Sequence, residues 1–205
     1  MCMGKGLHIA VILFILFFLI AFSYDIYVVQ KADELVKKQF DKLHNDVLTG
    51  IFQFFSLVGS KRIIFPLYFC LLLLMCSYSR WDFAAAFTLN TFAVRYINAK
   101  LKLLFSRERP SWEHFTIVTD FSFPSGHAMN AAAFYGYIAI CLLQSRFPYR
   151  KMTAVIFLSL IFLIGISRIY LGVHFPTDVI AGWAAGGVWA VCSYELTRYL
   201  KKYMK

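Results

Sequence analysis

The sequence predicts an all-α, polytopic membrane protein. We expect one domain over residues 1–205, a bundle of six transmembrane helices with an interfacial helix between the first two. Two observations predict this class. The chain is 60% hydrophobic and only 16% charged, far less charge than a soluble domain of 205 residues carries. Its apolar residues are also gathered into runs close to the ~20 residues that a helix needs to cross a bilayer.

The apolar runs define the expected spans. In chain order they cover residues 7–29, 63–79, 82–105, 125–145, 152–170 and 176–199. The first run could instead be a signal peptide, since Ala21-Phe22-Ser23 is a small-x-small pattern, but apolar residues continue to Val29 and favour a retained helix. The second run is short and contains Pro66. The fourth follows a helix-start pattern, and the sixth opens on Pro176, which suits a first helical turn.

The stretch between the first two spans is more polar. Residues 30–46 place apolar side chains at helical spacing, which is typical of a helix lying on the membrane surface. Residues 51–58 are apolar but few, and Gly59 and Ser60 interrupt them. We expect this segment to be interfacial or re-entrant.

The basic residues give an orientation and account for the net charge of +10. They lie mainly in loops and at the ends of apolar runs, so anionic lipid head groups explain them and no nucleic-acid partner is expected. No obligatory protein partner is inferred either. Six spans put both termini on one side, and the basic tail and the loop around Arg150 favour the cytoplasm, although residues 31–62 on the opposite side are basic too.

Three short polar runs stand at the ends of apolar segments. They are Lys102 with Arg109-Pro110; Pro124-Ser125-Gly126-His127; and Ser167-Arg168 with His174 and Asp178. Such residues are costly next to lipid, so their joint presence indicates a function. The chain crosses the membrane once per helix. The end of the third span, the start of the fourth, the end of the fifth and the start of the sixth must therefore share one leaflet, which is the outer one if the termini are inside.

The first two runs have the chemistry of an anion site. A helix N-terminus offers free N–H groups and a partial positive charge, and it is a ready phosphate site. Ser125 is the expected N-cap, and Gly126 lets a ligand approach the backbone. Lys102, Arg109 and Arg168 would add full positive charges around the phosphate oxygens.

The remaining residues suit acid–base and nucleophilic chemistry. A carboxylate at Asp178 can fix the tautomer of His174 and leave its other ring nitrogen as a nucleophile. His127 is then available to protonate the leaving oxygen. Each run alone is weak: a Pro-Ser-Gly-His is an ordinary helix start, and arginines at helix ends commonly extend to the interface. The combination, in this order and on one leaflet, is what carries the prediction.

These residues closely resemble the signature of the type-2 phosphatidic acid phosphatase superfamily, the membrane lipid phosphate phosphatases. That pattern is Lys, six residues, Arg-Pro; Pro-Ser-Gly-His; and Ser-Arg, five residues, His, three residues, Asp. Every motif residue between 102 and 178 fits. The resemblance implies a metal-independent phosphohydrolase without cofactors, in which His174 forms a phosphohistidine, Asp178 orients it and His127 is the acid. By the same resemblance Lys102, Arg109, Ser125, Gly126 and Arg168 hold the phosphate.

The substrate should be a membrane lipid, because a site at the leaflet surface can hold a head group while the tail stays in the bilayer. By resemblance the candidates are undecaprenyl diphosphate, phosphatidylglycerophosphate and phosphatidic acid. A non-hydrolytic lipid or anion transporter that uses the same cationic pocket is the alternative. Transport favours charges near helix centres, and apart from Arg95 the predicted centres have none.

Other residues near the motifs have plainer interpretations. Arg95, one heptad before Lys102, could extend the cationic site or pair with a carboxylate elsewhere, and a structural role is favoured. Arg107 and Glu108 could reach the head group, but a solvated loop pair is favoured. Gly182 and Gly186 form a small-x-x-x-small pattern that predicts close packing inside the bundle. Four aromatic residues flank the second motif and would either line a lipid access path or anchor the interface; they are Trp112, Phe115, Phe121 and Phe123.

Overall fold

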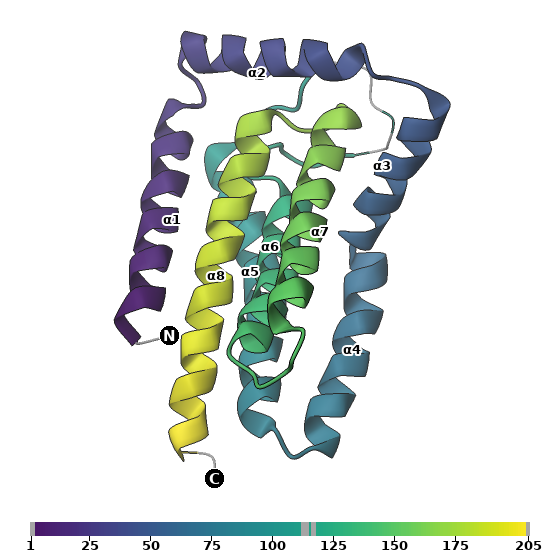
Figure 1. The fold of residues 1–205 in the computed structure, drawn as a ribbon. Coiled ribbons are helices and arrows are strands. Elements are labelled where there is room, and N and C mark those ends of the chain that lie inside the picture. Colours follow the sequence, from purple (N-terminus) through teal and green to yellow (C-terminus); the bar gives the residue numbers. More distant parts are fainter. Residues whose placement is uncertain (1–2, 112–114, 116–117, 204–205) are drawn as a thin grey trace.

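The computed structural model describes residues 3–111, 115 and 118–203. Within these residues the chain forms eight α-helices. They are α1 (Met3–Ser23), α2 (Tyr27–Asp41), α3 (Asp46–Val58), α4 (Lys61–Ser77), α5 (Trp81–Phe105), α6 (Gly126–Leu143), α7 (Arg150–Tyr170) and α8 (Pro176–Tyr203). All but α2 run along the bundle, and α2 lies across one end of it (Figure 1). Helix α1 begins and α8 ends at the opposite end.

Several helices could cross a membrane. Within the described residues α1, α6, α7 and α8 are long and apolar enough, and the bent pair α3–α4 makes a fifth candidate. Helix α5 is 25 residues long and runs beside them, but it carries buried polar side chains, among them Asn90, Asn98 and Lys102. The predicted starts of the last four spans agree with α5 to α8 to within two residues.

The predicted first helix is too long. Helix α1 ends at Ser23, and Ile26 has an extended backbone before α2 begins at Tyr27. Tyr27 and Val28 are 73% and 71% exposed, so they belong to the helix across the end of the bundle. Hydropathy alone cannot separate the end of a spanning helix from the apolar face of the surface helix that follows it.

The segment 51–58, expected to be interfacial or re-entrant, is helical. It is the second half of α3, which Asn45 caps by accepting a hydrogen bond from the Leu48 N–H at 2.9 Å. After Gly59 and Ser60 the chain continues as α4, at 43° to α3. The two helices extend in the same general direction (Figure 1). The two small residues bend the path because the Ser60 hydroxyl starts a new helix by accepting from the Arg62 N–H.

Close packing of α8 on α6 brings two of the motifs together. A side chain at Gly186 would lie 2.2 Å from the carbonyl oxygen of Met129, and one at Gly182 would lie 2.8 Å from that of Ser125. The two glycines therefore let α8 approach the first turns of α6, as the small-x-x-x-small pattern predicts. The Ser125 N–H then donates to the carbonyl of Asp178 at 3.0 Å.

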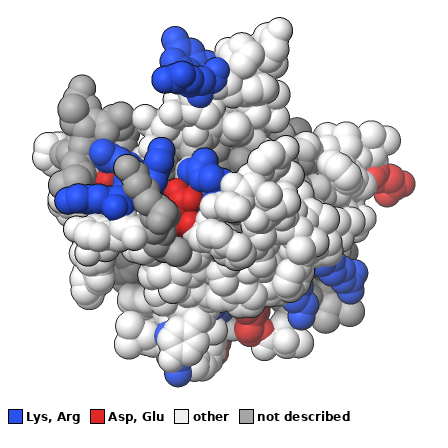
Figure 2. Space-filling model, turned by 90° about the horizontal axis from the view of Figure 1, so that it is seen from below, with Lys and Arg blue, Asp and Glu red and all other residues white. Residues whose placement is uncertain are grey.

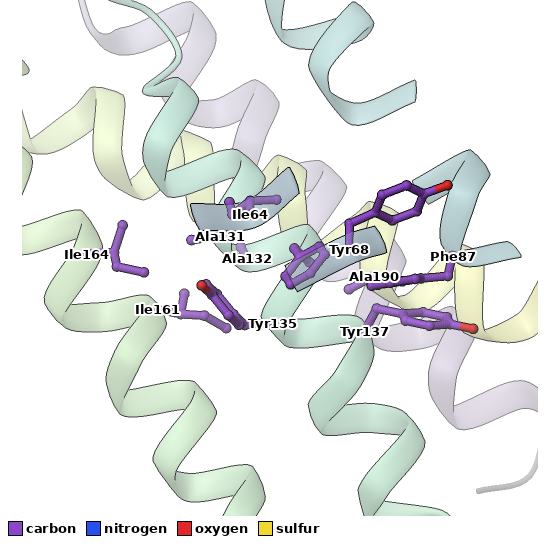
Figure 3. Close-up of a cluster of buried hydrophobic side chains, with 11 residues drawn as sticks. Ile64, Tyr68, Phe87, Ala131, Ala132, Tyr135, Tyr137, Ile161, Ile164 and Ala190 are labelled. Carbon is purple, nitrogen blue, oxygen red and sulfur yellow. The ribbon is translucent and has the colours of Figure 1, made fainter. Parts of the chain in front are cut away.

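A buried hydrophobic cluster packs helices α4 to α8 together in the interior of the bundle. Its side chains come from α4, α5, α6, α7 and α8 and face one another (Figure 3). They are Ile64, Tyr68, Phe87, Ala131, Ala132, Phe134, Tyr135, Tyr137, Ile161, Ile164 and Ala190. The Tyr135 hydroxyl donates at 3.0 Å to the carbonyl of Val58, a group that the bend after α3 leaves without a helical partner. This cluster packs together the helices that carry the motif residues at the polar end of the bundle.

Candidate active site

The three motifs meet at the end of the bundle that α2 covers. There the structure has a cavity of about 560 Å³. Six of the eight predicted site residues line it: Lys102, Arg109, Gly126, His127, Arg168 and His174. Ser125 and Asp178 are 0% exposed and lie behind its wall. The prediction from the alternating direction of successive helices, that the three motifs lie at one end of the bundle, is therefore correct.

His174 lies just before α8 and is held from behind. Its Nδ1 is 3.4 Å from Oδ2 of Asp178 and 3.2 Å from Oγ of Ser122. Ser122 donates its proton to the same Asp178 oxygen at 2.5 Å, so the oxygen of Ser122 is free to accept from Nδ1. Ser122 is therefore a third member of this group, and sequence reasoning missed it because a lone serine in a loop has no distinguishing pattern.

The other nitrogen of His174 faces the cavity. Arg109 Nη1 lies 3.3 Å from His174 Nε2, and the same nitrogen donates at 2.5 Å to the carbonyl of Val173. A guanidinium can only donate, so Nε2 carries the lone pair and Nδ1 the proton. Burial, and then the charges of Arg109 and Arg168, lower the pKa of His174 well below 6.5. The imidazole is therefore neutral, with its lone pair directed towards the cavity.

Asp120 pairs with the two cations of the first motif. Lys102 donates to it at 2.7 Å and Arg109 at 2.5 Å, and Lys102 also donates to the carbonyl of Phe121. Burial alone would raise the pKa of Asp120, but these two cations outweigh it and lower the pKa to about 2. Asp120 was not predicted. Its only sequence signal is that it is a carboxylate in the loop between two cationic motifs.

The start of α6 differs from the prediction in one respect. Ser125 occupies the N-cap position, but its side chain makes no capping hydrogen bond, and its buried Oγ has no hydrogen-bond partner in the described residues. Gly126 lines the cavity, and a side chain there would lie 2.9 Å from Oδ1 of Asn98. Asn98 itself donates at 3.2 Å to the carbonyl of Pro124. The Cβ of any other residue would collide with Asn98, so a glycine is required here. Asn98 is the third residue, after Ser122 and Asp120, that sequence reasoning missed.

Arg168 is 3% exposed at the end of α7. It donates from Nη1 to the hydroxyl of Ser56 on α3, and its Nε has no hydrogen-bond partner within the part of the chain that the structure describes. A buried guanidinium N–H without an acceptor is costly. It is a polar atom that a bound anion would satisfy.

Arg107 is not the solvated loop residue of the sequence prediction. Its side chain is 9% exposed, and it donates at 2.6 Å to Oδ1 of Asp178 and at 3.1 Å to Oδ2 of Asp33 on α2. Asp33 also accepts from the N–H and hydroxyl of Thr177, at 3.0 Å and 2.7 Å, and so caps α8. Helix α2 therefore braces the carboxylate that holds His174. Nothing local in the sequence links Asp33 to Arg107.

The flanking aromatic residues have separate positions. Phe123 is fully buried and packs on Tyr24 and Phe105, so it is neither an access-path residue nor an anchor. Phe115 lines the cavity, and Phe121 is partly exposed. Trp112 lies outside the described residues.

The sequence profile of the PAP2 superfamily matches residues 81–202, which include all three motifs. The chain belongs to the PAP2 superfamily. It is 36% identical over 184 residues to phosphatidylglycerophosphatase B of Bacillus subtilis, covering 85% of this chain and 87% of that protein. It is 33% identical over 92 residues to an undecaprenyl-diphosphatase of Sulfolobus acidocaldarius, covering 45% of this chain and 41% of that one.

A solved PAP2 structure has the same fold. The crystal structure of a transmembrane PAP2 type phosphatidylglycerolphosphate phosphatase from Bacillus subtilis superimposes with a TM-score of 0.84 and 32% identity, covering 96% of this chain and 97% of that one. The family resemblance predicted from the motifs is confirmed. Together with the apolar helices, it makes this chain a multi-pass membrane lipid phosphatase of the PAP2 kind. Among the residues that the structure describes, no three His, Cys, Asp or Glu side chains gather as a metal site.

Proposed function

We propose that this PAP2 protein hydrolyses the phosphate monoester or diphosphate group of a membrane lipid through a phosphohistidine at His174, without a metal. One observation carries the proposal. The Nε2 lone pair of a neutral, buried His174 faces a cavity lined by Lys102, Arg109 and Arg168, while Nδ1 is held by Asp178 and Ser122. This is the arrangement that an in-line displacement at phosphorus needs.

The reaction has two steps. In the first, the Nε2 lone pair attacks phosphorus, a P–N bond forms, and the P–O bond to the lipid breaks as His127 protonates the leaving oxygen. In the second, His127 takes a proton from water, the resulting hydroxide attacks phosphorus, and the P–N bond breaks. Asp178 stabilises the positive imidazole that exists between the two steps.

The proposed phosphate-binding residues act by charge and by free donors. The Nε of Arg168, which lines the cavity and has no partner among the described residues, gains an acceptor when a phosphate oxygen arrives, and Ser125 holds the start of α6 from behind the cavity wall. Arg109 then transfers its contact from Nε2 to the phosphate, which frees the nucleophile. Lys102 and the backbone around Gly126 complete the cradle. Fixed cations and dipoles of this kind are the largest expected contribution to a phosphoryl-transfer rate.

The topology proposal has six crossings, with α3–α4 as one bent span and α5 as the sixth. Both termini are then cytoplasmic, and the cavity opens at the outer leaflet of the cell membrane. Figure 2 views the end opposite α2, where Lys and Arg groups outnumber Asp and Glu. The exposed basic residues of that end are Arg80, Arg146, Arg150, Lys151, Arg198, Lys201 and Lys202. Positive charge is typical of the cytoplasmic side.

The substrates that we propose are undecaprenyl diphosphate, phosphatidylglycerophosphate and phosphatidic acid. The relatives named above support this range, since one acts on a phosphatidylglycerophosphate and another on undecaprenyl diphosphate by name. Both are phosphatases, and neither favours the transporter alternative. The test is phosphate release from the three lipids and from a soluble phosphate ester by the purified protein in detergent. Turnover of a lipid by the wild type and none by His174→Ala supports the proposal, whereas equal turnover by both contradicts it.

A further inference from the structure

The cavity extends well past His174, along one face of α5. Arg95, Asn98 and Lys102 all line it. Their spacing of three and then four residues puts them on the same side of the helix. Seven residues of α-helix rise about 10 Å, so Arg95 lies about 10 Å further into the bundle than Lys102. The cavity is therefore longer than one phosphate group requires.

A second group of cations surrounds this inner part. Lys61 and Arg62 form the first turn of α4, just after the bend, and line the same cavity as Arg95. The guanidinium of Arg95 lies 4.8 Å from the centre of the Phe65 ring, one turn along α4, which places the three cations near one another. The N–H groups of the first turn of α4 add a partial positive charge on the same side.

These three cations have no counter-ion. Within the described residues no ion pair involves Arg95, Lys61 or Arg62. Six Lys or Arg side chains line the cavity, and the one carboxylate that lines it among the described residues, Asp120, is already shared by Lys102 and Arg109. A phosphate monoester brings only about 1.5 to 2 negative charges, so it leaves most of this positive charge unmatched.

A polar atom between the two groups also lacks a partner. Asn130 lies one turn below Gly126 on α6 and lines the cavity. Its Nδ2 donates at 2.6 Å to the carbonyl of Gly126, and its buried Oδ1 has no hydrogen-bond partner among residues 3–111, 115 and 118–203. A buried acceptor without a donor is costly, and a ligand hydroxyl would satisfy it.

We propose that Arg95, Lys61 and Arg62 form a second anion subsite that binds a second phosphate group of the same lipid. The inference rests on the proposed function and narrows it to lipids with two phosphates. The monoester to be cleaved lies at His174, and the phosphodiester of the same head group lies at Arg95. Asn130 then accepts a hydrogen bond from a hydroxyl on a spacer between them. Phosphatidylglycerophosphate, which has two phosphates joined by glycerol, fits this arrangement better than phosphatidic acid.

The test compares substrates with one and two phosphates in the full-length protein in detergent micelles. The lipids are phosphatidylglycerophosphate, undecaprenyl diphosphate and phosphatidic acid, with a soluble phosphate monoester as a second one-phosphate reference. The variants are Arg95→Gln and the double variant Lys61→Gln/Arg62→Gln. Lys100→Gln is the matched control, because Lys100 is exposed on the same helix and stacks on Tyr96, away from the cavity.

We expect the wild type to favour a two-phosphate lipid over phosphatidic acid by at least about tenfold in kcat/KM. Arg95→Gln and the double variant should each lose about tenfold on that lipid, the value of one charge-assisted hydrogen bond, and less than about twofold on the one-phosphate substrates. Lys100→Gln should match the wild type on all four.

Equal losses on all substrates, or no loss on any, overturn the second subsite. If Arg95→Gln does not fold, the double variant decides, because both of its side chains are exposed. Loss confined to phosphatidylglycerophosphate supports a phosphodiester at the subsite, whereas loss confined to undecaprenyl diphosphate, whose adjacent phosphates have no spacer between them, overturns it. A wild type that hydrolyses none of the four refutes the proposed function itself, whereas a wild type without preference refutes the subsite alone.

Discussion

Removal of the Ser122 hydroxyl should slow catalysis without weakening substrate binding. Ser122 is 0% exposed, donates to Asp178 at 2.5 Å and lies 3.2 Å from Nδ1 of His174. It does not line the cavity, so it acts on the substrate only through His174. In Ser122→Ala, Oδ2 of Asp178 keeps the Phe175 N–H at 2.9 Å and the longer contact to His174, and the imidazole loses one of its two supports.

The size of the effect follows from the bond that is lost. A hydrogen bond to a charged group contributes about 1.5–3 kcal/mol. At about 1.4 kcal/mol per factor of ten, the full loss corresponds to a decrease of about 10- to 150-fold in kcat. Because the interaction orients the nucleophile and leaves the phosphate-binding cations in place, KM should change by less than about twofold.

The assay is steady-state phosphate release from a lipid phosphate in detergent, with kcat and KM determined separately. Ser145→Ala is the control, because the Ser145 hydroxyl donates to the Leu142 carbonyl and accepts from the Phe147 N–H at the opposite end of the bundle. Ser122→Thr, which restores the hydroxyl, should recover part of the rate. An unchanged kcat in Ser122→Ala, or a rise in KM with kcat intact, would refute the positioning role.

The remaining predictions concern the same end of the bundle. Arg107→Gln leaves Asp33 and Asp178 buried without their cation and should destabilise the fold by about 3–5 kcal/mol in denaturant titrations, with partial recovery in Arg107→Gln/Asp33→Asn; equal stability of wild type and Arg107→Gln would contradict this. The pKa of His174 is held well below 6.5, so the protonation of His174 should reduce kcat/KM only below pH 6.5. A decrease of kcat/KM at or above pH 6.5 that depends on His174 would contradict this prediction. As the pH falls through about 6.5, the unfolded chain binds a proton at His174 and the folded chain does not. The free energy of unfolding therefore keeps the full contribution of the neutral His174 above pH 6.5 and loses it on acidification. Activity should survive EDTA and be inhibited by vanadate; loss with EDTA that a divalent ion restores would refute the metal-free mechanism.

The sequence predicted the parts of this molecule that depend on periodicity and parity. Hydropathy located the starts of α5 to α8 because each begins at a polar boundary. Because successive membrane helices alternate in direction, the sequence also predicted that the three motifs lie at one end of the bundle, without any knowledge of how the helices pack. The small-x-x-x-small pattern at Gly182 and Gly186 predicted the close α6–α8 contact, which a side chain at either glycine would obstruct.

The parts that were missed depend on contacts distant in sequence. Asp33 reaches Thr177 across 144 positions, and Ser122 reaches Asp178 across 56. No local pattern reports such pairs. Arg107 was interpreted as solvated because it lies in a loop, but the loop folds inward under α2 and buries it. The bend at Gly59 also depends on packing: two small residues in an apolar run can either end a span or redirect it, and the sequence does not distinguish the two.

The most direct test of the central claim is to trap the intermediate. Purified protein would be mixed with a lipid phosphate labelled in its terminal phosphate, quenched in base within the first turnover because phosphohistidine is labile in acid, and mapped by mass spectrometry. The account predicts phosphate on His174 in the wild type, more of it in a His127→Gln variant in which water attack is slowed, and none in His174→Ala. Phosphate on another residue, or full turnover in His174→Ala, would contradict it.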